Sequence, residues 1–154
     1  MSRRIILKRR LNKKDSKYNN FLVNILINKI LKKGKKSIAE YIVYKAFELI
    51  ELKINKNPII ILENAVKIIS PRVRLESNYS NKNTYQIPKI LNLYYSTNLA
   101  IKWLVESSKK RNGKTMYLKL ANEILDTIKG SGNSIKKRDE MHKKAEANKA
   151  FVKF

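Results

Sequence analysis

The sequence contains no cysteine and only one histidine among its 154 residues. The lack of cysteine excludes disulfide bonds, a thiolate metal site and a cysteine nucleophile. The single histidine, His142, cannot supply a histidine pair for a metal, and no Ser–His–Asp triad is indicated. We therefore expect no enzyme activity, no bound metal and no cofactor.

Acidic residues are also scarce. Twelve Asp and Glu stand against 35 Lys and Arg, which gives a formal net charge of +23 at pH 7. Such an excess causes self-repulsion in the free protein, and a partner that carries phosphates relieves it. Nucleic acid is the expected partner, with binding driven largely by counterion release and weakened by salt.

Long apolar runs are absent as well. No run approaches the roughly twenty residues needed to span a bilayer, and the N-terminal run of three is too short for the core of a signal peptide. A membrane surface is therefore the weaker candidate for the polyanionic partner. The N-terminal arginines also allow a mitochondrial presequence, but residues 1–17 carry a net charge of +7 and are interpreted as a basic arm.

The hydrophobic content of the chain is sufficient for a core. Hydrophobic residues make up 43% of the chain, and no repeat or long linker divides it, so residues 1–154 are predicted to form one domain. Most of the chain has the apolar spacing of helices. We expect these helices at about residues 18–33, 37–53, 58–70, 97–111 and 115–129, with a further one at the C-terminus.

Several residues define the ends and faces of these helices. Ser37 and Glu40 have the spacing of a capping box, Asn57 precedes Pro58 as an N-cap, and Gly130 is a C-terminal cap. The spacing of the second helix predicts an inward face made of Ile38, Ile42, Val43, Ala46, Leu49 and Ile50.

The apolar period changes to two after Pro71. Residues 73–77 and 84–87 alternate like strands, and the residues between them tolerate turn conformations. The pattern predicts a β-hairpin over residues 72–88, whose second strand ends before Pro88. Because a lone hairpin is marginally stable in water, we expect it to project and to order against a partner.

The C-terminal segment, residues 133–154, favours a helix but has few large apolar residues. Between Gly130 and Phe154, seven basic residues outnumber three acids. A helix this polar is not held mainly by an apolar stripe, so it is predicted to lie on a polyanion. His142 on this helix is predicted to contact solvent or phosphate.

Two local features have competing interpretations. Residues 112–115 are similar to the end of a phosphate-binding loop, but that motif needs a glycine where Ser108 stands and a strand before it. A turn between two helices is the favoured interpretation. Trp103 is predicted to lie in the core rather than to form a stacking platform, because it falls within an apolar helix register.

Short motifs in order along nearly the whole chain carry a family resemblance. The most specific is Ala-Glu-Ala-Asn-Lys-Ala-Phe at residues 145–151, and the others lie at 34–44, 64–71, 84–88, 99–103, 109–111 and 120–123. With these motifs the sequence resembles the small-subunit ribosomal protein seven family of bacteria and organelles. The resemblance implies a mainly α fold, a six-helix bundle with a protruding β-hairpin between the third and fourth helices.

The same resemblance implies a function. Members of the family bind the 3′ major domain of small-subunit rRNA, nucleate assembly of the subunit head, and lie near the exit tRNA site and the mRNA path, beside small-subunit protein eleven. The residues implied to meet rRNA are Arg3, Arg4, Arg9, Arg10, Lys35, Lys36, Lys109, Lys110, Arg111, Lys114, Lys136, Lys137, Arg138, Lys143, Lys144 and Lys149. Those implied to lie near tRNA and mRNA, at the hairpin tip, are Asn78, Tyr79, Asn81 and Lys82.

The hairpin tip departs from the family pattern. The family usually has two arginines and a Gly-Gly pair where this chain has the four tip residues just named, and further arginines where it has Asn92, Tyr95 and Ser96. Fewer phosphate contacts are expected there, since neither Lys nor Asn replaces the planar fork of Arg. Tyr79, Tyr94 and Tyr95 are interpreted either as base-stacking residues or as packing residues.

Composition also bears on the source. Lys, Ile and Asn together number 64, with only eight Arg, a bias typical of AT-rich genomes. The chain is most similar to plastid-encoded members, so we expect it in the plastid stroma; a mitochondrion or the cytoplasm of an AT-rich bacterium are the alternatives. The alternative function is a general basic RNA-binding or translational-regulatory protein outside the ribosome.

Overall fold

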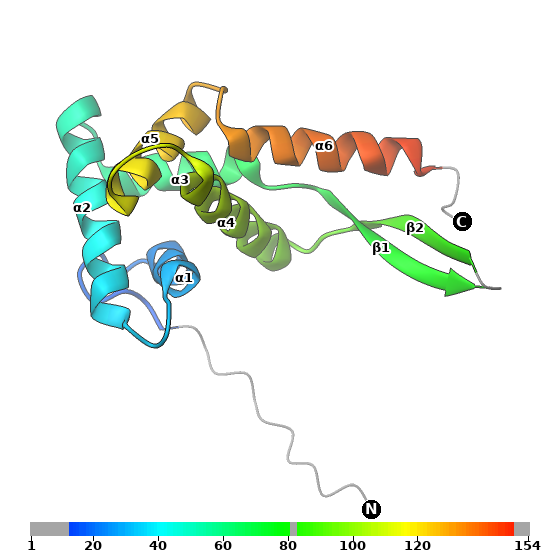
Figure 1. Cartoon of the computed structure of the whole chain (residues 1–154), viewed down its shortest axis with the longest axis horizontal. Helices are drawn as coiled ribbons and strands as arrows, with labels where there is room; N and C mark the ends of the chain where they lie inside the picture. Colours follow the sequence, from blue (N-terminus) through cyan, green and yellow to red (C-terminus); the bar gives the residue numbers. More distant parts are fainter. Residues whose placement is uncertain (1–12, 81–82, 150–154) are drawn as a thin grey trace, which may run out of the picture.

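A computed structural model describes residues 13–80 and 83–149. Within these residues the chain forms six helices and one antiparallel hairpin, and the hairpin lies between the third and fourth helices (Figure 1). The predicted fold class is therefore confirmed. The elements are α1 (Phe21–Ile30), α2 (Lys36–Ile54), α3 (Pro58–Ile69), β1 (Val73–Ser80), β2 (Asn83–Ile90), α4 (Leu93–Lys110), α5 (Met116–Ile128) and α6 (Asn133–Ala147).

The first five helices pack into a body around one apolar core. Helix α5 contacts α2, α3 and α4, while α1 packs against α2 and α4. Phe47, Leu104 and Leu120 are among the largest fully buried side chains of this core. Trp103 is only 7% exposed, which confirms its predicted place in the core. Burial of these apolar surfaces is the main source of stability in such a body.

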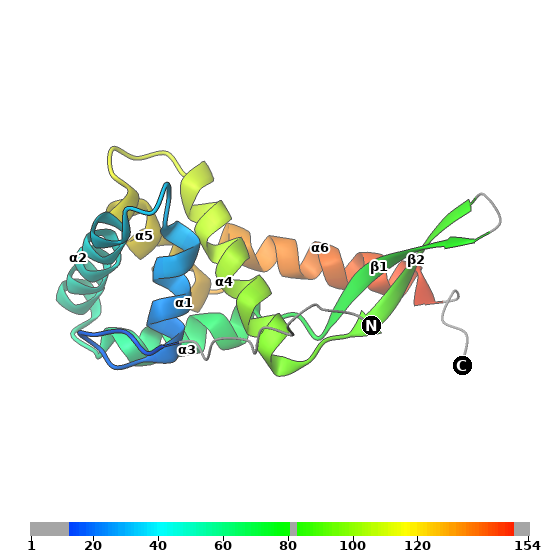
Figure 2. The same cartoon turned by 90° about the horizontal axis from the view of Figure 1, so that it is seen from below.

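The hairpin and α6 extend together from the body, side by side in both views (Figures 1 and 2). Their contact is direct, because α6 packs against β1. The hairpin therefore projects, as predicted. Its second strand does not end before Pro88: Pro88 pairs with Leu75 in the register, and the strand continues to Ile90. A two-stranded ribbon has open edges on both sides, where a residue without an N–H is tolerated.

Three predicted helix starts are wrong. Helix α1 begins at Phe21, three residues after the predicted start. Helix α2 begins at Lys36, so Ser37 lies inside it and forms no capping box; Glu40 pairs instead with Lys36 at 3.2 Å. Helix α4 begins at Leu93, four residues before the predicted start. The predicted cap at Asn57 is confirmed, since its side chain accepts a hydrogen bond from the Ile59 N–H at 2.9 Å.

The face predicted for α2 is correct apart from its first member. Val43, Ala46 and Ile50 are buried, but Ile38 is 53% exposed. Ile38 lies in the first turn of the helix, where a cavity separates it from α5. Gly130 follows α5 with φ 83°, the left-handed conformation expected of a C-terminal cap.

Candidate nucleic-acid interface

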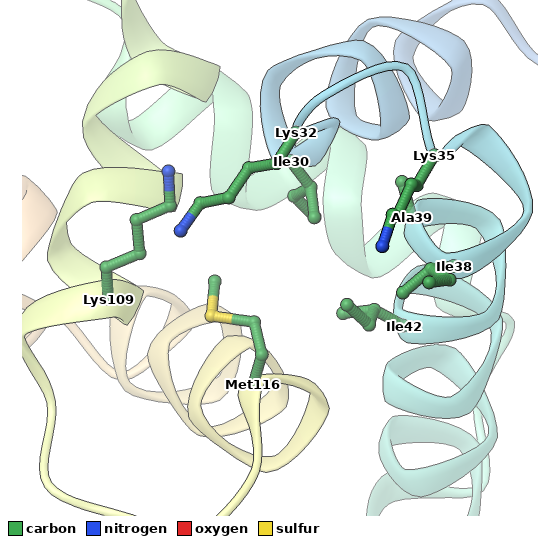
Figure 3. Close-up of a pocket in the computed structure, with 8 residues that line it drawn as sticks. All are labelled: Ile30, Lys32, Lys35, Ile38, Ala39, Ile42, Lys109 and Met116. Atoms are coloured by element: carbon green, nitrogen blue, oxygen red, sulfur yellow. The ribbon is translucent and has the colours of Figure 1, made fainter.

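Two of the basic segments predicted to meet RNA come together at one end of the body. The loop between α1 and α2 supplies Lys32 and Lys35, and the last turn of α4 supplies Lys109. These three exposed residues, the lysine rim, surround the opening of a cavity of about 250 Å³ (Figure 3). Lys32 and Lys109 extend from opposite sides toward that opening. The cavity is lined further by Ile30, Ile38, Ala39, Ile42 and Met116.

The backbone of the α1–α2 loop explains how its lysines reach the opening. Lys33 and Gly34 both adopt positive φ, 50° and 75°, which reverses the chain within a few residues. Glycine accepts this conformation without steric cost, whereas lysine does so less readily. The Lys35 N–H donates to the Lys32 carbonyl at 3.1 Å and closes the turn. Lys32 is absent from the predicted site, although its place in the basic run 32–36 is a signal for it.

The other lysines predicted for this region are exposed but lie outside the cavity lining. Lys36 forms its ion pair with Glu40, Lys110 follows Lys109 at the end of α4, and Lys114 lies in the loop before α5. All the lysines that the sequence assigns to rRNA at this end of the body are therefore exposed. It did not indicate the cavity between the two loops.

Arg111 differs from these lysines, because its guanidinium group binds carboxylates of the same chain. Its Nε donates to Glu123 Oε2 at 2.6 Å, and its second contact is with Asp126. Burial acts to lower the pKa of Arg111, but the hydrogen bonds that it donates to Glu123 and Asp126, together with their negative charges, outweigh burial and raise that pKa. The fully buried Glu123 also accepts hydrogen bonds from the N–H and hydroxyl of Ser134, at 3.0 and 2.6 Å. Arg111 thus joins the end of α4 to α5 and to the start of α6.

The basic residues of α6 divide into two groups. Lys137 donates to Glu106 Oε2 at 2.7 Å, and Arg138 donates to the Ile68 carbonyl at 2.6 Å and to Asp139. These two side chains hold the helix to α4 and α3. The remaining predicted residues are exposed, namely Lys136, Lys143, Lys144 and, just after the helix, Lys149.

The bond between Lys137 and Glu106 also changes an acid–base equilibrium. The hydrogen bond and the positive charge of Lys137 lower the pKa of Glu106, while partial burial opposes the shift. His142, predicted to contact solvent or phosphate, is partly exposed, and its Nε2 accepts a hydrogen bond from the Arg72 N–H at 3.3 Å. Helix α6 is thus anchored to the body near its start and to the base of the hairpin near its end.

The hairpin presents polar and aromatic side chains away from the body. Tyr79 is 75% exposed, and Asn78 beside it is exposed too. Glu76 is paired with Arg74 at 2.8 Å and with Lys89 across the strands at 3.2 Å, and the hydrogen bond from Lys89 lowers its pKa. Tyr94 and Tyr95, at the start of α4, form an edge-to-face pair with ring centroids 5.7 Å apart and are about half exposed.

Six of the predicted residues lie outside the described residues. They are the four arginines of the N-terminal arm and two residues of the hairpin tip, that is, Arg3, Arg4, Arg9, Arg10, Asn81 and Lys82.

Within residues 13–80 and 83–149, no helix has the length and apolar character needed to cross a membrane. The same residues contain no group of three or more His, Cys, Asp or Glu placed to hold a metal ion.

Comparisons with known proteins identify the family. The family model described as ribosomal protein S7p/S5e matches residues 1–149. The chain is also 46% identical, over 143 residues, to the small ribosomal subunit protein uS7c of Trieres chinensis, an alignment that covers 93% of this chain and 90% of the relative. Both matches agree with the family predicted from the sequence motifs. With a mainly helical fold, a hairpin after its third helix and these matches, the chain belongs to the ribosomal protein S7p/S5e family, whose members are structural proteins of the small ribosomal subunit.

Proposed function

We propose that the protein binds the 3′ major domain of small-subunit rRNA in a plastid ribosome and nucleates assembly of the subunit head. The observation that carries this proposal is the distribution of exposed lysines. One set surrounds the cavity between the α1–α2 loop and the end of α4, and another lies along α6, which extends from the body beside the hairpin. Two basic surfaces held at a fixed separation by one body suit a folded RNA, in which separate helices approach each other.

The projecting hairpin gives the second part of the proposal. The hairpin reaches toward the exit tRNA site and the mRNA path, while the protein lies beside small-subunit protein eleven. Support comes from the projection of β1 and β2 away from the body and from the exposed Tyr79, which offers a stacking surface to an unpaired base. The plastid setting is supported by the 46% identity to uS7c of Trieres chinensis.

The test compares two RNAs across a series of salt concentrations. The folded 3′ major-domain fragment should bind at least about a hundredfold more tightly than an unrelated structured RNA of equal length, and the preference should persist at high salt. Equal affinities that fall together with salt would overturn the proposal. They would favour a general basic RNA-binding protein, the alternative that the net charge alone allows.

Single substitutions then locate the contact. Lys35→Ala and Lys110→Ala should each weaken binding to the rRNA fragment and reduce the slope of log K against log salt by roughly one unit for each lost phosphate contact. Lys56→Ala is the matched control, because it removes the same charge at the opposite end of α2. A slope that changes equally in all three variants would contradict the assignment of the lysine rim and its neighbours to the interface.

A further inference from the structure

We propose that the cavity within the lysine rim receives one unstacked nucleobase of the bound RNA, whose flanking phosphates the rim lysines hold. This inference rests on the proposed function and adds a ligand of stated chemistry to one part of that interface. It follows from the combination of an apolar interior and a cationic opening in one place (Figure 3).

Apart from the three rim lysines, every residue that lines the cavity is apolar. Of the apolar lining residues, Ile30 and Ala39 are buried, and Ile42 and Met116 are partly exposed. The Met116 thioether points into the space, where a polarisable sulfur makes favourable contacts with an aromatic ring. An unpaired base has two apolar faces, and contact of these faces with the apolar lining is favourable while the polar edges of the base stay at the opening.

The opening is cationic. The lining includes the three rim lysines, and no acid stands among the eight described residues that form it. Two helices also begin beside it, α2 at Lys36 and α5 at Met116, and neither N-cap, Lys35 or Thr115, makes a side-chain capping bond. The N–H groups of the first turns, of which that of Lys36 donates to the Gly34 carbonyl at 2.9 Å, add partial positive charge at the N-terminal ends of both helices.

The apolar interior and the cationic opening together indicate which ligand the cavity receives. An apolar protein side chain would match the interior but not the lysines, and a free phosphate would match the lysines but not the interior. A nucleotide extruded from an RNA loop has both parts, a planar base with apolar faces and a phosphate on each side of it. A second cavity of about 340 Å³, between α3 and the ends of α2 and α5, has one lysine, Lys56, among its lining residues and so lacks the cationic opening.

Ile38 provides a substitution that blocks the cavity without touching the core. It lines the cavity and is 53% exposed, so Ile38→Trp should fill the opening and leave the fold intact. The matched control is Leu52→Trp, the same addition on the other end of α2 at a side chain that is 82% exposed. Circular dichroism spectra and melting curves of both variants check that they fold as the unmodified protein does.

The first readout is affinity for the folded 3′ major-domain fragment. We expect Ile38→Trp to weaken binding about tenfold, the effect of one lost stacking contact, with an unchanged salt slope because no charge is removed. Leu52→Trp should bind as the unmodified protein does. Equal affinities of Ile38→Trp and the unmodified protein would overturn the inference while leaving the proposed function standing.

The second readout identifies the base. Dimethyl sulfate and 2′-hydroxyl acylation should find an unpaired nucleotide that is protected by the unmodified protein and reactive with Ile38→Trp. Removing that base from the RNA should weaken binding of the unmodified protein about tenfold and leave binding of Ile38→Trp unchanged.

A loss of affinity in Ile38→Trp without any such nucleotide would overturn the inference. An unmodified protein that does not prefer the fragment would overturn the proposed function and this inference together. The two failures are therefore distinguishable.

Discussion

At the scale of single residues, the contact between Arg111 and Glu123 determines how the second half of the chain is held together. Glu123 is completely buried and accepts hydrogen bonds from Arg111 and Ser134. The turn into α6 also packs closely against α5, because a Cβ atom at Gly132 would lie 2.7 Å from Thr127 Oγ1. A buried carboxylate is stable only while its partners remain, so these contacts are expected to be sensitive to substitution.

Arg111→Ala tests this role. It leaves the Glu123 carboxylate buried with Ser134 but without its cationic partner, and we expect the free energy of unfolding to fall by about 2–3 kcal/mol. Lys110→Ala, one residue earlier and exposed, should change it by less than about 0.5 kcal/mol. Urea unfolding followed by circular dichroism measures both. Equal stabilities of the two variants would show that Arg111 does not hold α5 and α6 in place.

The same residue marks the limit of what the sequence could predict about the site. Exposure of Lys35, Lys109 and Lys110 follows from the charge of a loop and of a helix end, and the structure agrees. The partners of Arg111 lie 12 and 15 residues further along the chain. Their spacing places Glu123 and Asp126 on one face of a helix, but no local pattern shows that the α4–α5 loop folds back onto that face.

At the scale of elements, α6 is a helix held by polar contacts. It buries Ser134, Ile135 and Ala145, while Lys137 and Arg138 bind groups on α4 and α3. The sequence predicted a polar helix in this place, and also that it would need a polyanion to lie on. The bonds of Lys137 and Arg138 to the body join segments 31 and 70 residues apart, which apolar periodicity does not report.

The ion pair between Lys137 and Glu106 makes part of this docking dependent on pH. The pKa of Glu106 is lower in the folded chain than its ordinary value of 4.5, so the pair stabilises the fold above that value and loses its effect as pH falls through the lowered pKa. Both side chains are partly exposed, and the contribution is therefore no more than about 1 kcal/mol.

Glu106→Gln should accordingly destabilise the protein by up to about 1 kcal/mol at pH 7 and by less at about pH 3, where protonation of Glu106 weakens the ion pair. Glu146→Gln removes an exposed carboxylate from α6 itself and is the control, with little expected effect at either pH. Urea unfolding at the two pH values provides the measurement. A difference between Glu106→Gln and the unmodified protein that is the same at both values would exclude the ion pair as its cause.

At the scale of the whole molecule, the shape of the fold determines where the positive charge is exposed. A body of five helices carries the core, and an arm formed by the hairpin and α6 extends from it (Figure 1). The position of the hairpin was predictable from the change of apolar period after Pro71. Its alignment with α6 was not, because the contacts between them, such as the bond between Arg72 and His142, join segments 70 residues apart in the sequence.

The net charge of +23 predicts opposite responses of stability and binding to salt. Self-repulsion among 35 basic residues destabilises the free protein, and salt screens it, since the Debye length falls from about 30 Å at 0.01 M to about 10 Å at 0.1 M ionic strength. Salt also weakens the exposed ion pairs, such as that between Lys45 and Glu48 at 3.3 Å, but each of those contributes little. Because positive charge is in large excess, the screening of repulsion outweighs the weakening of ion pairs, and salt stabilises the free protein.

We therefore expect the melting temperature of the free protein to rise between 0.01 and 0.3 M sodium chloride. A gain of about 1 kcal/mol corresponds to about 2–4 °C in a chain of this size. Choline chloride at equal ionic strength should give the same rise, because the effect is screening and not binding of one cation. Over the same range the affinity for the rRNA fragment should fall. A melting temperature that stays constant or decreases would mean that the fold separates its positive charges well enough to avoid repulsion, and the need for a phosphate-rich partner would then rest on binding data alone.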